Sequence, residues 1–166
     1  MNDAHWHLAL NHLPIIIPVA GLLVLVGGMF LKSEILKRAA YCLFVFATIT
    51  ALIAGSTGEG AEKMVEGMLG IDEHFIEVHE DTAGIFIVLL YILGGLSLIG
   101  LWANWKKKPF SKVISIVIMA FVFVVLFYAQ QTGTTGGEIR HTEIRTDETT
   151  NAPILNQIEE HEEAED

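Results

Sequence analysis

Apolar residues are concentrated in four long stretches of the chain, and polar residues collect between and after them. Reading outward from each apolar centre gives uncharged stretches over 8–31, 39–58, 82–104 and 113–131. Each has about 19 to 24 residues, enough for a helix to cross a hydrocarbon core of about 30 Å. The pattern predicts four transmembrane helices. The first is expected to be retained, because it has neither a basic leader nor an A-x-A cleavage site.

Composition supports a membrane protein. Of the 166 residues, 52 % are hydrophobic and 18 % are charged, whereas soluble domains are less apolar and more charged. A soluble enzyme, a nucleic-acid binder and a secreted disulfide scaffold are disfavoured, and the single cysteine, Cys42, cannot form an intramolecular disulfide. We expect an all-α fold, a polytopic up-down bundle of four transmembrane helices over 1–137. The acidic tail over 138–166 is expected to be disordered.

Charge is divided unevenly between the connections. Segments 32–38 and 106–112 hold seven Lys and Arg against one Glu, whereas the rest of the chain holds three Lys and Arg against nineteen carboxylates. Enrichment of Lys and Arg in short loops marks the cytoplasmic side of a membrane. Both termini and the connection 59–81 are therefore expected outside, which in a bacterium is the periplasmic face of the inner membrane.

The histidines lie at or beyond the outer boundary of the predicted spans. His12 lies about one turn inside the first stretch, where an ionisable side chain is costly and by default indicates a functional site. His79 lies about one turn before the third stretch. Thr-Gly-rich turns close the second stretch (56–62) and the fourth (132–138), which suggests two parallel hairpins. Such hairpins would let His12 and His79 face each other across the bundle, as haem ligation by two imidazoles requires.

Other chemistry remains open at the same end. Neutral imidazole suits copper and zinc, and the glutamates resemble those of di-iron bundles in residue type, although the repeated Glu-x-x-His pattern of such bundles is missing. Glycines in the spans allow either close helix packing or room for a flat cofactor. The candidate ligands for a metal ion are His5, His7, His12, Glu62, Glu77, His79 and Glu80.

Four segments carry a family resemblance. They resemble segments of the small bacterial four-helix membrane proteins of the domain-of-unknown-function family numbered 2231. The four segments are HLALNHLP with His12, TGEGAE, IEVHEDTAG with His79 and GGEIRH with His141. That family is similar to the four-helix di-haem cytochromes that include the b561-type proteins, which implies haem b and electron transfer. Those relatives bind haem on both sides of the membrane. This chain has no histidine near its inner end, so one haem at most is expected.

The leading expectation is a periplasm-facing redox protein with one b-type haem between His12 and His79, and with His141 as a reserve ligand. Glu62, Glu77 and Glu80 would tune the potential or accept protons, and the acidic outer face could dock a basic periplasmic cytochrome. The alternatives are a membrane protein that binds copper, zinc or iron without haem, and a structural subunit of a larger membrane complex. Electron transfer or metal binding is expected rather than a stand-alone enzyme.

Overall fold

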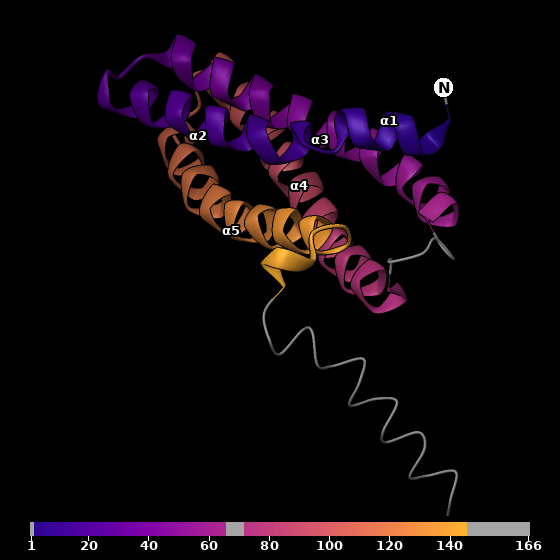
Figure 1. Ribbon diagram of the computed structural model, residues 1–166. Coiled ribbons are helices and arrows are strands. Elements are labelled where there is room, and N and C mark those ends of the chain that lie inside the picture. Colours follow the sequence, from indigo (N-terminus) through magenta and orange to yellow (C-terminus); the bar gives the residue numbers. More distant parts are fainter. Residues whose placement is uncertain (1, 66–71, 146–166) are drawn as a thin grey trace, which may run out of the picture.

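The computed structural model describes residues 2–65 and 72–145, and this part of the chain is helical throughout. Four candidate spans are long and apolar enough to cross a membrane, α1 and α2 together forming the first. The all-helical fold class is therefore confirmed. The helices, in chain order, are α1 (Asp3–Leu10), α2 (Leu13–Phe30), α3 (Glu34–Val65), α4 (Glu73–Trp105), α5 (Ser111–Glu138) and the short 3-10 helix η1 (Thr142–Ile144) (Figure 1).

The first predicted helix is interrupted. Residues 8–31 do not form one continuous helix, because α1 ends at Leu10 and α2 begins at Leu13 after a turn at Asn11 and His12. Pro14 explains the break, since a proline ring clashes with the carbonyl group four residues earlier, here that of Leu10, and has no N–H to bond it. In the first turn of α2 the same proline is tolerated, because the N–H groups there have no helical partner anyway.

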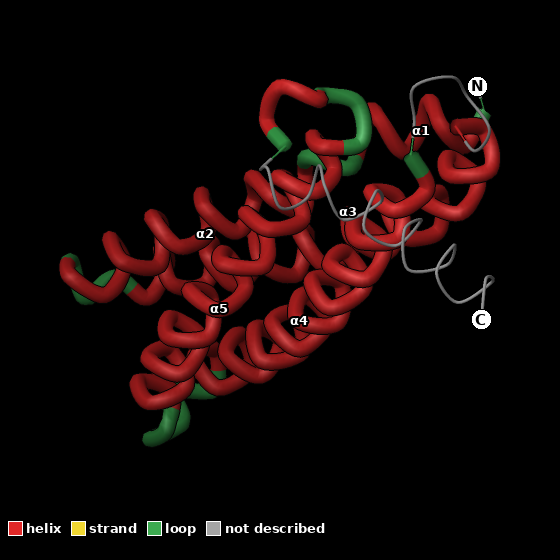
Figure 2. Tube along the Cα trace, turned by 60° about the horizontal axis from the view of Figure 1, so that its bottom comes forward, coloured by secondary structure: helices red, strands yellow, loops and turns green. Residues whose placement is uncertain are grey.

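Four long helices form a ring. Helix α2 packs against α3 and α5, and α4 packs against the same two helices, so α2 and α4 stand at diagonal corners. Helix α1 lies along the end of α3, beyond the end of α2 (Figures 1 and 2). The two-hairpin arrangement expected from the sequence is therefore present.

The centre of the ring is apolar and closely packed. Leu25, Phe44, Leu90 and Val122 are fully buried there. Among the glycines of the spans, Gly21, Gly28, Gly94 and Gly100 pack tightly against neighbouring helices, whereas Gly27, Gly84 and Gly95 have open space beside them. Close helix approach thus accounts for about half of these glycines.

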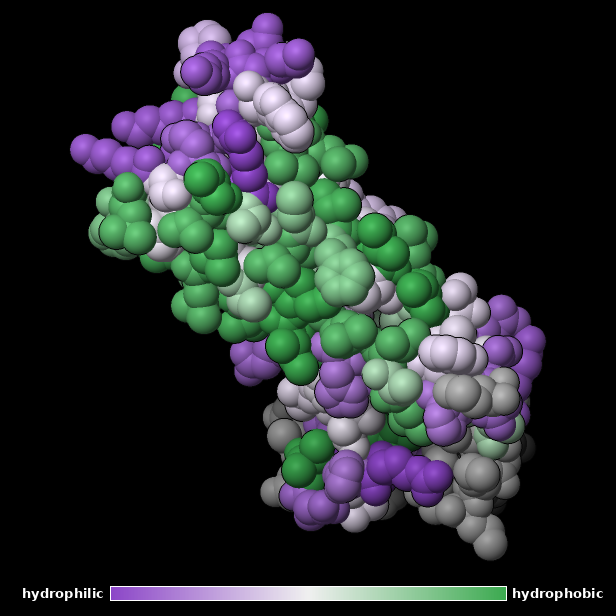
Figure 3. Space-filling model, turned by 90° about the horizontal axis from the view of Figure 1, so that it is seen from above, coloured by the Kyte–Doolittle hydropathy of each residue, from purple (hydrophilic) through white to green (hydrophobic). Residues whose placement is uncertain are grey.

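The surface has an apolar band between two polar ends (Figure 3). We call residues 30–38 and 102–112 the lysine end. At the opposite end are α1, the last turns of α3 and α5, the first turns of α4, and η1. We call this the histidine end, and here α3, α4 and α5 continue beyond the apolar stretches. This distribution is compatible with a multi-pass membrane protein.

The predicted tail is partly ordered. Residues 138–145 belong to the end of α5 and to η1, and they fold back onto the bundle. Arg145 donates hydrogen bonds to the carbonyl oxygens of Glu138 (2.8 Å) and Ile139 (3.3 Å), and its guanidinium lies 3.8 Å from the ring centre of Phe75. The disorder expected of the remaining tail concerns 146–166, which lie outside the described residues.

Candidate functional site at the histidine end

His7 lies half-buried between α1 and α3. Its Nδ1 is 3.0 Å from the carbonyl oxygen of Ala54. A carbonyl oxygen can only accept, so Nδ1 carries the hydrogen, and in the neutral ring the lone pair is on Nε2. The hydroxyl of Thr57 donates to the same carbonyl at 3.1 Å and lies 3.5 Å from Nδ1. The protein therefore sets both the orientation and the tautomer of His7.

His79 is held in a similar way between α4 and α5. Its Nδ1 lies 3.1 Å from the hydroxyl oxygen of Thr135, and that hydroxyl donates to the carbonyl oxygen of Thr132 at 3.3 Å. Both contacts are satisfied together when Nδ1–H donates to the Thr135 oxygen, and in that tautomer the lone pair of His79 is on Nε2. Both rings therefore keep one nitrogen available as a ligand while the other is anchored.

The two anchoring segments correspond residue by residue. Segment 54–60 reads AGSTGEG and segment 132–138 reads TGTTGGE, so that Thr57 matches Thr135 and Gly58 matches Gly136. A Cβ atom at Gly58 would lie 3.7 Å from Cε1 of His7, and one at Gly136 would lie 2.9 Å from Cε1 of His79. Each imidazole therefore rests on a glycine one residue after the threonine that anchors or approaches it.

His7 is the histidine of the first span that acts electrostatically on His79, because the two rings would repel each other when both are protonated. His12 is exposed and occupies the N-cap position of α2, where its side chain forms no capping hydrogen bond. His7 lies within α1, whereas His12 lies in the turn between α1 and α2, so the two side chains leave the first span at different elements. Pro14 was the available signal, because a proline in the first turn marks the start of a helix and leaves His12 at its cap.

The other candidate residues are dispersed. His5, Glu77 and Glu80 are exposed and Glu62 is half-buried. In 2–65 and 72–145, no group of three or more His, Cys, Asp or Glu could hold a metal ion. The residues that contact the two histidine rings were not predicted from the sequence: Ala54, Thr57, Thr132 and Thr135. The sequence feature that could have indicated them was the repeated Thr-Gly turn. It predicted the parallel hairpins, but it did not predict which residues contact the histidines.

The reserve ligand His141 lies apart from the pair. It is exposed after the end of α5, and its Nδ1 is 3.0 Å from Oε1 of Glu143. Hydrogen bonds from the backbone N–H of Glu143 itself and from His141 lower the pKa of the Glu143 carboxyl. Both side chains are exposed, so solvent screens this ion pair and it contributes little to stability.

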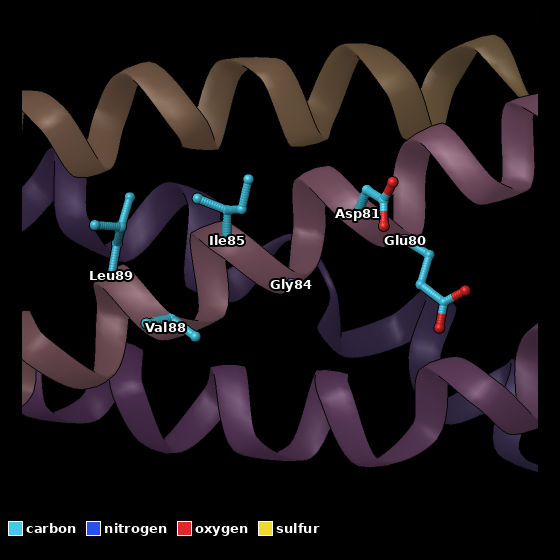
Figure 4. Close-up of a pocket in the computed structure, with 6 residues that line it drawn as sticks. All are labelled: Glu80, Asp81, Gly84, Ile85, Val88 and Leu89. Atoms are coloured by element: carbon cyan, nitrogen blue, oxygen red, sulfur yellow. The ribbon is translucent and has the colours of Figure 1, made fainter.

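A shallow groove of about 380 Å³ lies near the pair, on the outer surface of α4. Gly84, Ile85, Val88 and Leu89 form its apolar floor, and Glu80 and Asp81 lie at its polar end (Figure 4). None of the anchored histidines lines it. The groove is therefore separate from the histidine pair.

Comparisons with protein families, curated proteins and solved structures found no match. The family resemblance drawn from the sequence stays a prediction.

Proposed function

We propose that the protein is a membrane-embedded redox protein that binds one b-type haem at the histidine end, where His7 and His79 would hold it. The observation that carries the proposal is the pair of imidazoles with anchored Nδ1 atoms and available Nε2 atoms. Ligating histidines characteristically donate their other N–H to a carbonyl, a carboxylate or water, which fixes the ring and raises its basicity.

The donor set fits haem. A porphyrin occupies four coordination positions of iron, so two imidazoles complete the set, and bound haem iron supplies one-electron chemistry. The rings belong to two different hairpins, and they are within the range at which their protonated forms would repel each other. In this proposal Ala54 and Thr135 orient the rings, and Thr57 and Thr132 complete the hydrogen bonds behind them.

The proposal puts the histidine end on the periplasmic side of a bacterial inner membrane, because the lysine end carries the excess of Lys and Arg. Carboxylates surround the histidine end, among them Glu77, Glu80 and Asp81, which are exposed. This acidic surface would attract a basic cytochrome, and that attraction would weaken as salt rises. Electrons would then enter or leave the protein on the periplasmic side.

The test is the visible spectrum of the full chain, purified in detergent from cells supplied with haem, first air-oxidised and then dithionite-reduced. We expect a Soret band that shifts on reduction. His7→Ala and His79→Ala should each abolish the bis-histidine spectrum. His5→Ala and His12→Ala are the matched controls, because they remove an exposed histidine within five residues of His7, and they should leave it unchanged.

Loss of the spectrum in His12→Ala but not in His7→Ala would contradict the ligand pair. A protein that is featureless in visible light but contains stoichiometric copper, zinc or iron would overturn haem and favour the non-haem metal protein. A protein that contains neither haem nor a stoichiometric metal and that co-purifies with other membrane proteins would favour a structural subunit.

A further inference from the structure

The lysine end has more positive charge than its own carboxylates can balance. Segments 32–38 and 106–112 contain seven Lys and Arg and a single carboxylate, that of Glu34. Glu34 is already engaged, because it accepts from Lys37 Nζ at 2.7 Å and from the side-chain amide of Asn104. The remaining cations of these two segments are therefore available to an anion from outside the protein.

Arg38 is the cation whose position is best defined. It is half-buried between α3 and α4, where its Nε donates to the side-chain oxygen of Asn104. Its guanidinium carbon lies 5.9 Å from the ring centre of Trp105. Among the described residues Arg38 forms no ion pair. The Glu34 carboxylate attracts it electrostatically, but the two groups are farther apart than an ion pair. Asn104 and Trp105 therefore hold a guanidinium in place without neutralising it.

Apolar groups adjoin these cations on the same surface. Trp105 is 72 % exposed and Ile35 is 77 % exposed. The Lys108 Nζ atom lies 5.2 Å from the ring centre of Trp102, which is also exposed. Tryptophan rings favour the headgroup level of a bilayer, and basic side chains beside them favour anionic headgroups. The surface is suited to a molecule with an anionic head and an apolar tail.

We propose that the lysine end is a binding site for an anionic phospholipid, whose phosphate pairs with Arg38 and with a lysine of the 106–108 turn while an acyl chain packs beside Trp105 and Ile35. The guanidinium fork matches phosphate oxygens, and its fixed position reduces the entropy lost on binding. This site is independent of the proposed haem and lies at the other end of the bundle.

The test is native mass spectrometry of the full chain in detergent, titrated with phosphatidylglycerol, with phosphatidylcholine of the same acyl chains, and with inorganic phosphate. The wild type should retain phosphatidylglycerol at least about fivefold more tightly than phosphatidylcholine, from about 1 kcal/mol per basic group at a membrane surface. Arg38→Gln should remove about fivefold of the affinity for phosphatidylglycerol and leave that for phosphatidylcholine unchanged.

Arg140→Gln is the matched control, because it removes the same charge from an exposed residue at the opposite end and should not change lipid retention. Lys106→Gln removes an exposed cation and keeps the backbone N–H through which Lys106 bonds Asn104. It keeps the test valid if Arg38→Gln unfolds, and it should weaken phosphatidylglycerol binding alone. Equal retention of both lipids would overturn the proposal, as would equal losses in Arg38→Gln and Arg140→Gln. Inorganic phosphate that binds with the same dependence on Arg38 would replace the lipid with a free anion.

Discussion

Single residues at the histidine end show how much of the site depends on local geometry. His79 was predicted as a ligand from its place before an apolar stretch, and in the structure it is anchored to Thr135. His7 was predicted only as one of several metal ligands, yet its ring is anchored as firmly, to Ala54. Their partners lie 47 and 56 residues away in the chain, so the sequence around each histidine could not reveal them.

Gly136→Ala tests whether the ring of His79 needs this geometry. The added methyl group would lie 2.9 Å from Cε1 of the ring, which must then turn or shift. If His79 ligates haem, we expect haem affinity to fall by about tenfold or more, as when a residue that orients a ligating histidine is lost. Haem titration of the apoprotein, followed at the Soret band, measures the change.

The control for Gly136→Ala is Gly133→Ala in the same helix. There the methyl group would lie 3.9 Å from Ile15 Cδ1, an ordinary contact, while the gain in helix propensity is the same. Haem affinity should be preserved. An equal effect of both substitutions would show that helix α5, rather than the His79 ring, is responsible.

At the scale of elements, the two turns of the lysine end have the same construction. After α2, Lys32 has φ 51° and Ser33 N–H bonds the carbonyl of Gly28 at 2.9 Å. After α4, Lys107 has φ 50° and Lys108 N–H bonds the carbonyl of Ala103 at 2.9 Å. A left-handed residue followed by an N–H that bonds the carbonyl five residues before it is the Schellman ending of a helix, in which glycine usually takes the left-handed position. In this protein a lysine occupies the left-handed position in both turns, and its backbone is strained there.

Lys107→Gly should therefore stabilise the protein, by about 0.5–1 kcal/mol, because glycine adopts a positive φ without the Cβ clash. Thermal unfolding in detergent, followed by circular dichroism, should show a higher Tm. Lys106→Gly removes the same charge next to it, at φ −82°, and should not raise the Tm. If the two variants behave alike, the strain at Lys107 has been overstated.

The lengths of the helices show what the sequence pattern predicted and what it missed. The four apolar stretches located the helices correctly. Three of them, 39–58, 82–104 and 113–131, each lie within one longer helix, and 8–31 covers α2 and the end of α1. The helices continue as polar extensions at the histidine end, where α3 reaches Val65 and α4 begins at Glu73. Charged residues form helix there because packing and capping support it, and hydropathy alone does not register those contributions.

At the scale of the whole molecule, the opposite charges of the two ends predict how it sits in a membrane. Because Lys and Arg remain on the cytoplasmic side, the lysine end should face the cytoplasm and the histidine end the periplasm. In a Cys42→Ser background, a membrane-impermeant maleimide applied to intact bacterial cells should label Glu59→Cys and not Lys107→Cys.

Both positions are exposed, so accessibility to solvent is matched at the two ends. Permeabilised cells provide the positive control, in which both cysteines should react. Labelling of Lys107→Cys alone in intact cells would reverse the orientation. It would also place the proposed haem on the cytoplasmic side.

The sequence by itself determined an all-helical bundle with four apolar spans, its two hairpins and the opposite charges of its ends. The lengths of the uncharged stretches and the positions of Lys and Arg are properties of the sequence itself, so they can be read without coordinates. Only the tertiary structure showed that His7 is hydrogen-bonded to α3 and acts electrostatically on His79, whereas His12 is exposed. That outcome depends on the rotation of α1 before the Pro14 break and on the packing of α1 against α3, and both follow from contacts between residues distant in the chain.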